Sequence, residues 1–204
     1  MIAAPLHAVA YIRDEGAEAA GVIHWTDDVF DAVPGLWDWA SPRTVYLTYG
    51  RITSVLLALM LVGAIALHRR QRQPARRFER WTFRAFAVAA TLLVLGALME
   101  YYTPFLDEAF LFVALPGLAL TLVTGLLFGI SAARADAVPK WQGVLLAVAF
   151  LPGVPLLVAL LGHIPIAMSL VAVAWIFIGF HLLRTSSDGE TPTARPVGAA
   201  SPRA

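Results

Sequence analysis

Hydrophobic residues in this chain are concentrated in five long runs that contain almost no charged side chain. The runs occupy residues 45–68, 83–102, 108–130, 142–162 and 164–183. Each is about 20 residues or longer, which is the length that an α-helix needs to cross the ~30 Å hydrocarbon core of a bilayer. A single apolar segment in lipid must satisfy its backbone hydrogen bonds internally, so each run is predicted to be a transmembrane helix.

The sequences around these runs divide the chain into three predicted parts. Residues 1–44 mix apolar and acidic residues, and we expect an extracytoplasmic segment with a short helix on the membrane surface. A buried sixth helix is not expected there, because no charge-free run exceeds 12 residues. Residues 45–184 form the five-helix membrane domain. Residues 185–204 are small, polar and rich in proline, and are predicted to be a disordered cytoplasmic tail.

Charge alternates along the chain in step with the five runs. The stretch 68–84 has seven arginines and one acid, whereas residues 1–44 have two arginines and seven acids. Cytoplasmic loops of membrane proteins carry the excess of Lys and Arg. The predicted fold is therefore an all-α, polytopic membrane helix bundle of five transmembrane helices, with the N-terminus outside and the C-terminus in the cytoplasm. We expect it in the cell membrane as a multi-pass protein.

The arginine-rich stretch 68–84 also raises the question of nucleic-acid binding. Such a site needs a folded module or several stacking aromatic side chains beside the positive charge. Only Phe78 and Trp81 lie near this charge. Anionic lipid headgroups account for the arginines, so the lipid bilayer is the expected partner and no nucleic acid is expected.

The composition excludes several other classes of protein and site. Hydrophobic residues make up 59% of the 204 residues and charged residues 14%, which leaves too little polar surface for a soluble domain. The absence of cysteine excludes disulfides, thiolate metal sites and cysteine nucleophiles. The five histidines are not paired at one depth in the predicted helices, and no GxSxG or HExxH pattern occurs. We expect no metal, no cofactor and no catalytic residues.

Two features of the third and fourth runs predict how their helices pack: a stripe of small residues and two prolines. The small residues recur every four positions, at Gly117, Thr121, Gly125, Gly129 and Ala133. Such a stripe lets two helix backbones approach closely, and we expect it to serve packing within the chain rather than between copies. Pro116 and Pro152 each remove a backbone hydrogen bond, which predicts kinks in both helices.

Trp175 lies deep in the fifth run, far from either membrane surface. An indole N–H without an acceptor in hydrocarbon costs about 1–3 kcal/mol. The ring is therefore expected to point into the bundle, with Thr121 or Thr124 as the acceptor.

Arg51 and Glu100 are the charged residues set within the predicted helices, which makes them the candidate binding residues. Counted from the arginine-rich stretch at ~1.5 Å per residue, both lie about 24–26 Å from the inner membrane boundary. Ionisable residues at this depth usually face the bundle and pair, which predicts an Arg51–Glu100 ion pair with Tyr49 or Tyr101 nearby. A structural clasp between the first two helices is a more frequent role for such a pair than a proton or substrate relay.

The second half of the chain carries a recurrent set of proline, tryptophan and glycine positions. They are Pro139, Trp141, Gly143, Gly162, His163, Pro165, Trp175 and Gly179. In these positions the chain resembles a group of uncharacterised small prokaryotic multi-pass integral membrane proteins of the actinobacterial and haloarchaeal type. Lys140 and Phe180 depart from the usual arginine and tyrosine. The resemblance implies a helical membrane domain over residues 45–184 and no particular activity.

These observations favour a non-enzymatic structural or accessory membrane component, with a larger membrane-protein complex as a further partner. The alternative is a small transporter or binder of a hydrophobic molecule that uses the kinked third and fourth helices. An enclosed cavity lined by Thr121, Thr124 and Trp175 would favour this alternative, whereas a tightly packed interior would argue against it.

Overall fold

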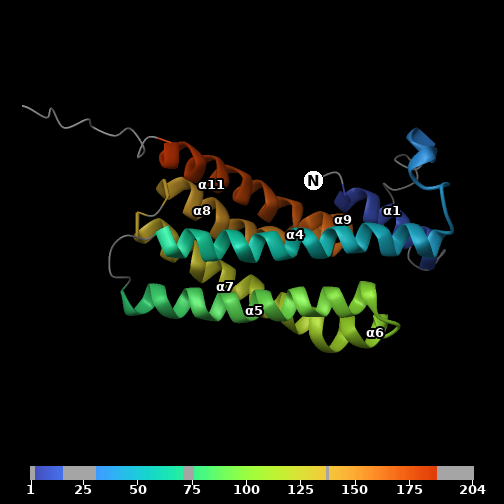
Figure 1. Cartoon of the computed structure of the whole chain (residues 1–204), viewed down its shortest axis with the longest axis horizontal. Coiled ribbons are helices and arrows are strands. Elements are labelled where there is room, and N and C mark those ends of the chain that lie inside the picture. Colours follow the sequence, from blue (N-terminus) through green and yellow to red (C-terminus); the bar gives the residue numbers. More distant parts are fainter. Residues whose placement is uncertain (1–2, 16–30, 71–75, 137, 188–204) are drawn as a thin grey trace, which may run out of the picture.

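The computed structural model describes residues 3–15, 31–70, 76–136 and 138–187, and every regular element within these ranges is a helix. The long helices lie side by side along one common direction (Figure 1). The predicted disordered tail falls on residues 188–204 for the most part, and these lie outside the described residues, as do residues 16–30 of the N-terminal segment.

Five helical segments are long and apolar enough to cross a membrane, as predicted. The first two are the unbroken helices α4 (Pro42–Arg70) and α5 (Arg77–Tyr102). The third joins α6 (Leu106–Ala109), the π-helical segment η2 (Phe110–Ala114) and α7 (Leu115–Arg134). The fourth joins α8 (Lys140–Val148), the π-helical segment η3 (Ala149–Gly153) and α9 (Val154–Leu161). The fifth joins α10 (Ile164–Ala167) and α11 (Ser169–Ser187).

The helices alternate in direction, so basic and acidic side chains collect at opposite ends of the bundle (Figure 1). The basic end holds Arg69, Arg76, Arg77, Arg80, Arg84, Arg134, Lys140 and Arg184 against two acids, Glu79 and Asp136. The acidic end holds Asp14, Asp38, Asp107 and Glu108 together with two arginines, Arg13 and Arg43. Both arginines are in ion pairs: Arg13 Nη1 lies 3.0 Å from Asp38 Oδ1, and Arg43 Nη1 lies 2.8 Å from Asp14 Oδ2. The orientation of these two ends across the membrane stays a prediction from their charge.

The small-residue stripe on α7 packs against neighbouring helices of the same chain, as predicted. A Cβ atom at Gly117 would lie 2.7 Å from the backbone nitrogen of Leu93 on α5. A Cβ atom at Gly129 would lie 2.5 Å from the backbone nitrogen of Ala147 on α8. Real Cβ atoms do not approach so closely, so glycine permits these close backbone contacts of α7 with α5 and α8.

The predicted kink at Pro152 is present in the fourth helix, whereas the third helix is continuous and has a π-helical turn before Pro116. The turn that precedes Pro116 is the π-helical segment η2, where the usual hydrogen-bonding pattern shifts by one residue. In η3, Leu151 has the non-helical angles φ −145° and ψ 115° immediately before Pro152. A residue before proline is pushed away from the helical region by the proline ring, which separates α8 from α9.

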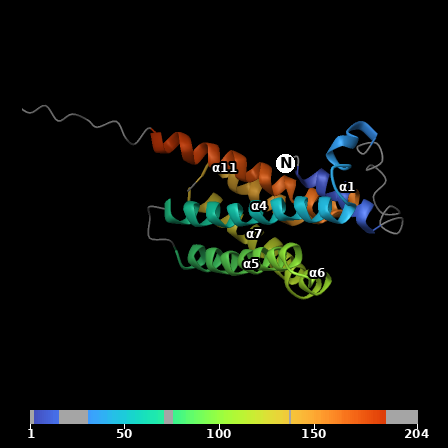
Figure 2. The same ribbon diagram turned by 45° about the vertical axis from the view of Figure 1, so that its right-hand side comes forward.

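The N-terminal helix α1 (Ala3–Glu15) corrects one expectation from the sequence. Residues 7–10 of α1 are all buried, so a sixth helix is buried in part against the bundle, contrary to expectation. Its position relative to the membrane surface stays a prediction. Figures 1 and 2 show α1 against α4 at the acidic end, and it also contacts α10. Because no charge-free run in residues 1–44 exceeds 12 residues, no helix of this segment was expected to cross a bilayer. A shorter helix can nevertheless cover one end of a bundle.

Candidate functional site

A cavity of about 310 Å³ lies at the acidic end of the bundle, between α1, α4, α5, α10 and the third spanning segment. Its polar and aromatic lining consists of His7, Tyr11, Tyr46, Thr53, Glu100, Tyr101, Asp107, Phe110 and His163. Among the described residues, no lysine or arginine lines it. The cavity therefore combines aromatic walls with acidic side chains and carries no basic side chain.

Five aromatic rings of this lining are in mutual contact. The ring centroid of His7 lies 4.9 Å from that of Tyr46, 5.5 Å from that of Tyr101 and 5.1 Å from that of His163. Tyr11 lies 5.9 Å from Tyr46 and 5.7 Å from His163. These separations are typical of tilted and edge-to-face aromatic pairs. Four helical elements that are distant in sequence thus contribute to one aromatic cluster.

The positions of these rings depend on the spacing of residues along α1 and on two glycines. His7 and Tyr11 are four residues apart on α1 and so share one face. His163 follows Gly162, which ends α9 in the left-handed conformation with φ 70° that glycine adopts without strain. On α4, a Cβ atom at Gly50 would overlap the ring of Tyr101, so glycine makes room for that ring.

Glu100 is one of two carboxyl groups in the lining, and it is buried near the end of α5. The hydroxyl of Tyr46 donates a hydrogen bond of 3.5 Å to Glu100 Oε1. A carboxylate in such a place accepts further hydrogen bonds readily, so Glu100 has capacity left for a ligand in the cavity.

The two histidines are held neutral by their surroundings. Burial lowers the pKa of His7 well below its ordinary value, and the nearby His163 lowers it further. Burial lowers the pKa of His163 to about 4. A neutral imidazole offers one N–H donor and one nitrogen acceptor. Within the described part of the chain, both ring nitrogens of His7 and Nδ1 of His163 are buried without a hydrogen-bond partner. Leaving such a group unpaired costs about 1–3 kcal/mol, so these nitrogens favour a water molecule beside them in the cavity.

The predicted ion pair between Arg51 and Glu100 is wrong. Arg51 is exposed, its Nε donates a 3.2 Å hydrogen bond to the backbone oxygen of Tyr101, and its guanidinium lies 5.1 Å from the ring centroid of Tyr102. Among the described residues Arg51 makes no ion pair with Glu100, which faces Tyr46 instead. Equal depth on two helices does not fix the direction of a side chain around the helix axis, because each residue turns it by about 100°. Of the two candidate residues, only Glu100 lines the cavity.

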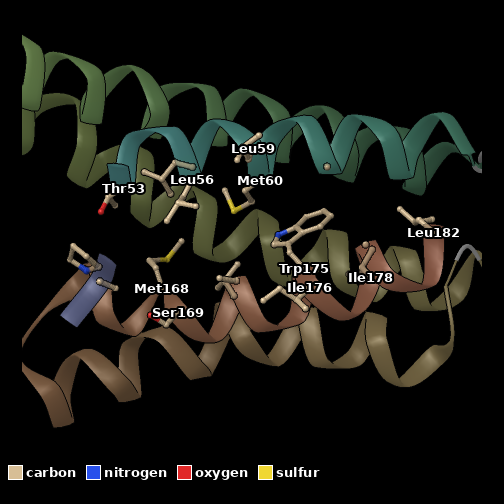
Figure 3. A pocket seen from close by; sticks show the side chains of 17 residues that line it. Thr53, Leu56, Leu59, Met60, Met168, Ser169, Trp175, Ile176, Ile178 and Leu182 are labelled. Atoms are coloured by element: carbon tan, nitrogen blue, oxygen red, sulfur yellow. The ribbon is translucent and has the colours of Figure 1, made fainter. Parts of the chain in front are cut away.

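The prediction for Trp175 is half correct. The indole points between α4 and α11, as Figure 3 shows, and packs against the core. The expected acceptor is wrong, because Trp175 Nε1 has no hydrogen-bond partner within the described ranges. The hydroxyl of Thr124 donates to the backbone oxygen of Leu120 at 2.6 Å, and the buried hydroxyl of Thr121 is also without a partner.

Sequence reasoning missed the two histidines as members of one site. His163 was expected only as a residue at the end of a helix, and His7 belonged to a segment expected on the surface. The one local signal was the spacing of His7 and Tyr11, which places two polar aromatic rings on one apolar helix face. No three His, Asp or Glu side chains of the described residues are grouped so that they could hold a metal ion.

Comparisons of the chain with family models, with curated proteins and with solved structures found no match. The resemblance of residues 45–184 to small prokaryotic multi-pass membrane proteins therefore stays a prediction. The fold itself establishes five apolar helices suited to a membrane, and the cavity provides the basis for a proposal about function.

Proposed function

We propose that this protein is a non-enzymatic, multi-pass component of the cell membrane that binds a small organic cation in the cavity at its acidic end. The observation that carries the proposal is the set of aromatic rings around the buried carboxyl group of Glu100, with no basic side chain among the described residues of the lining. The charge of the two ends favours placing this cavity at the outer face of the membrane.

Aromatic rings and a carboxylate together favour an ammonium group. The face of an aromatic ring attracts a cation by about 0.5–1 kcal/mol at exposed sites and by about 2 kcal/mol where water is excluded. Three tyrosine rings line the cavity, Tyr11, Tyr46 and Tyr101. A bound cation would also favour the ionised form of Glu100, because an opposite charge nearby stabilises a carboxylate.

The same lining disfavours anionic ligands. His7 and His163 are neutral and supply no positive charge, and the one arginine once expected here, Arg51, lies outside the cavity. An anion would therefore meet Glu100 and Asp107 with no cationic side chain in the lining, since the guanidinium of Arg43 lies 5.8 Å from the ring centroid of Tyr46 and does not line the cavity.

The earlier alternative, a hydrophobic site between the third and fourth helices, has less support. A Cβ atom at Gly125 on α7 would lie 2.5 Å from the ring of Phe150 in η3, so these two segments are in close contact. Thr124 is half-buried on α7, and its hydroxyl donates to the backbone oxygen of Leu120. Ligand binding is therefore better placed at the acidic end.

The test is titration of the purified protein in neutral maltoside detergent with tetramethylammonium, followed by calorimetry. We expect saturable binding that Glu100→Gln weakens at least about tenfold, which corresponds to about 1.4 kcal/mol. Arg51→Gln is the matched control, since it removes a charge of the neighbouring helix outside the cavity, and we expect it to bind as the wild type does.

A second variant distinguishes loss of the binding site from a loss of folding caused by Glu100→Gln. Tyr11 is half-buried, and Tyr11→Leu removes one ring of the lining while leaving Glu100 in place. We expect several-fold weaker binding, in keeping with the loss of one cation–π contact. Wild-type protein that does not bind tetramethylammonium, or equal binding by wild type and Glu100→Gln, would overturn the proposal.

A further inference from the structure

A second hollow adjoins the cavity and runs along the outside of the bundle between α4 and α11. It has a volume of about 380 Å³ and an almost wholly apolar lining. Figure 3 shows Thr53 and Met168 toward one end of this groove, Leu182 toward the other, and the indole of Trp175 between the two helices. We call it the α4–α11 groove.

The α4–α11 groove and the cavity adjoin each other. Four residues line both hollows: Thr53, Leu57, Pro165 and Met168. A molecule that occupies both hollows would pass between these four side chains. The polar part of the combined space lies at the acidic end, and its apolar part extends from there along the spanning helices.

The α4–α11 groove is open toward the membrane. Leu56, Leu59 and Ile176 line it and are exposed on the surface of the spanning segments. At Gly179, which also lines the groove, an added Cβ atom would meet nothing within 4 Å. The space is thus empty rather than closed by side chains, and lipid has direct access to it.

The length of the groove suits a hydrocarbon chain. Its lining on α11 extends from Ser169 to Leu182, a distance of about 20 Å at 1.5 Å per residue. Its volume of about 380 Å³ and its almost wholly apolar lining accommodate an extended chain of this length.

We infer that the natural ligand is a single-chain cationic amphiphile, whose ammonium group occupies the cavity and whose hydrocarbon chain lies in the α4–α11 groove. This inference rests on the proposed function and names its ligand class. The chain enters sideways from the bilayer, because the groove opens there. Transfer of the chain from lipid to an apolar groove changes its hydrophobic free energy little, so selectivity comes from the head group in the cavity and from the fit of the chain.

The experiment uses a long-chain alkyltrimethylammonium that carries bromine near the middle of its chain, added to the protein in neutral maltoside micelles. Bromine quenches tryptophan emission on contact, and Trp175 lies in the groove. The chain has six tryptophans, so the emission of Trp175 is taken as the difference between the wild type and Trp175→Phe. We expect saturable quenching of this difference, at least several-fold weaker when Gly179→Phe is introduced into both, where the new side chain fills the groove. Val62→Phe is the matched control, because Val62 is exposed on the same bundle and does not line the groove.

Tetramethylammonium, which has the head group and no chain, separates failure of the inference from failure of the proposed function. We expect Gly179→Phe to leave tetramethylammonium binding unchanged, since the cavity is intact. Equal quenching by the brominated probe in wild type and Gly179→Phe, with tetramethylammonium still bound, would overturn the inference alone. A brominated alkyl sulfate that quenches Trp175 as strongly as the ammonium probe would overturn the head-group assignment on which both proposals depend.

Discussion

The imidazole rings of His7 and His163 lie 5.1 Å apart at an interplanar angle of 51°, one on the N-terminal helix and the other at the start of α10. Both rings are buried. Their contact joins the first helix of the chain to its last helical hairpin. A proton added to either ring must be accommodated without hydration, and a second proton would place two positive charges side by side.

The first prediction concerns the pH dependence of stability. Both histidines have a lowered pKa in the folded protein, so the unfolded chain binds more protons than the folded one below about pH 6.5. The contribution of the two histidines to the free energy of unfolding is therefore fully present above this pH, and it is lost as the pH falls toward about 4. For His163 the loss is on the order of 3 kcal/mol, at about 1.36 kcal/mol per pH unit between the two pKa values.

Thermal unfolding of the purified protein at several pH values measures this loss. The side chains that face the two rings from the neighbouring elements are Tyr11, Tyr46, Glu100, Tyr101 and Asp107. Carboxyl groups titrate in part of the same range, so the double variant His7→Phe, His163→Phe serves as the control. We expect a clearly flatter pH profile in this variant. An unchanged profile would show that other groups cause the acid sensitivity.

The second prediction concerns the close contact of α5 with α7. Gly117→Val places a branched side chain against the backbone of Leu93, where no space exists. We expect a loss of about 1–3 kcal/mol, as is typical of overpacked interiors. Gly179→Ala is the control, because its Cβ atom meets open space and alanine favours a helix by up to about 1 kcal/mol over glycine. Equal unfolding temperatures for the two variants would contradict the packing described for α7.

The third prediction concerns Gly50 and the shape of the cavity. A Cβ atom in Gly50→Ala would overlap the ring of Tyr101, which must then move away from its place in the aromatic cluster. We expect several-fold weaker binding of tetramethylammonium, measured by calorimetry. Gly63→Ala on the same helix is the matched control, because its Cβ atom would lie 3.3 Å from Trp175 and far from the cavity lining. If both variants bind alike, the ring of Tyr101 does not contribute to the site.

The fourth prediction concerns the orientation of the bundle. The chain contains no cysteine, so a single introduced cysteine reports its own side of the membrane without background. Pro104→Cys, in the turn between α5 and α6 at the acidic end, should react with an impermeant thiol reagent on intact cells. Gln73→Cys, in the arginine-rich stretch, should react only after the cells are opened. The opposite pattern of labelling would reverse the orientation.

The five spanning helices were predictable because the length of an apolar run is a property of the sequence alone. The packing stripe on α7 and the kink at Pro152 were predictable for the same reason, since both depend on local chemistry. Glu100 was identified because a charge within an apolar run is rare. These features required no knowledge of how the helices are arranged around one another.

The remainder of the site depends on that arrangement. Arg51 and Glu100 lie at a similar depth, yet rotation about the helix axes directs one outward and the other into the cavity. His7 and His163 meet only because α1 turns back over the acidic end and contacts α10. Neither the direction of a side chain around its helix nor the docking of a short helix is determined by the spacing of apolar residues.

The contrast between the glycine contacts and the α4–α11 groove has a mechanical consequence. Where the backbones of α5, α7 and α8 touch through glycine, no side chain can yield, so this side of the bundle is stiff. Across the groove, α4 and α11 face each other over empty space and flexible side chains such as Met60 and Met168. We therefore expect a change in the lateral pressure of the membrane to deform this compliant side first, so that bilayer tension and the width of the groove vary together.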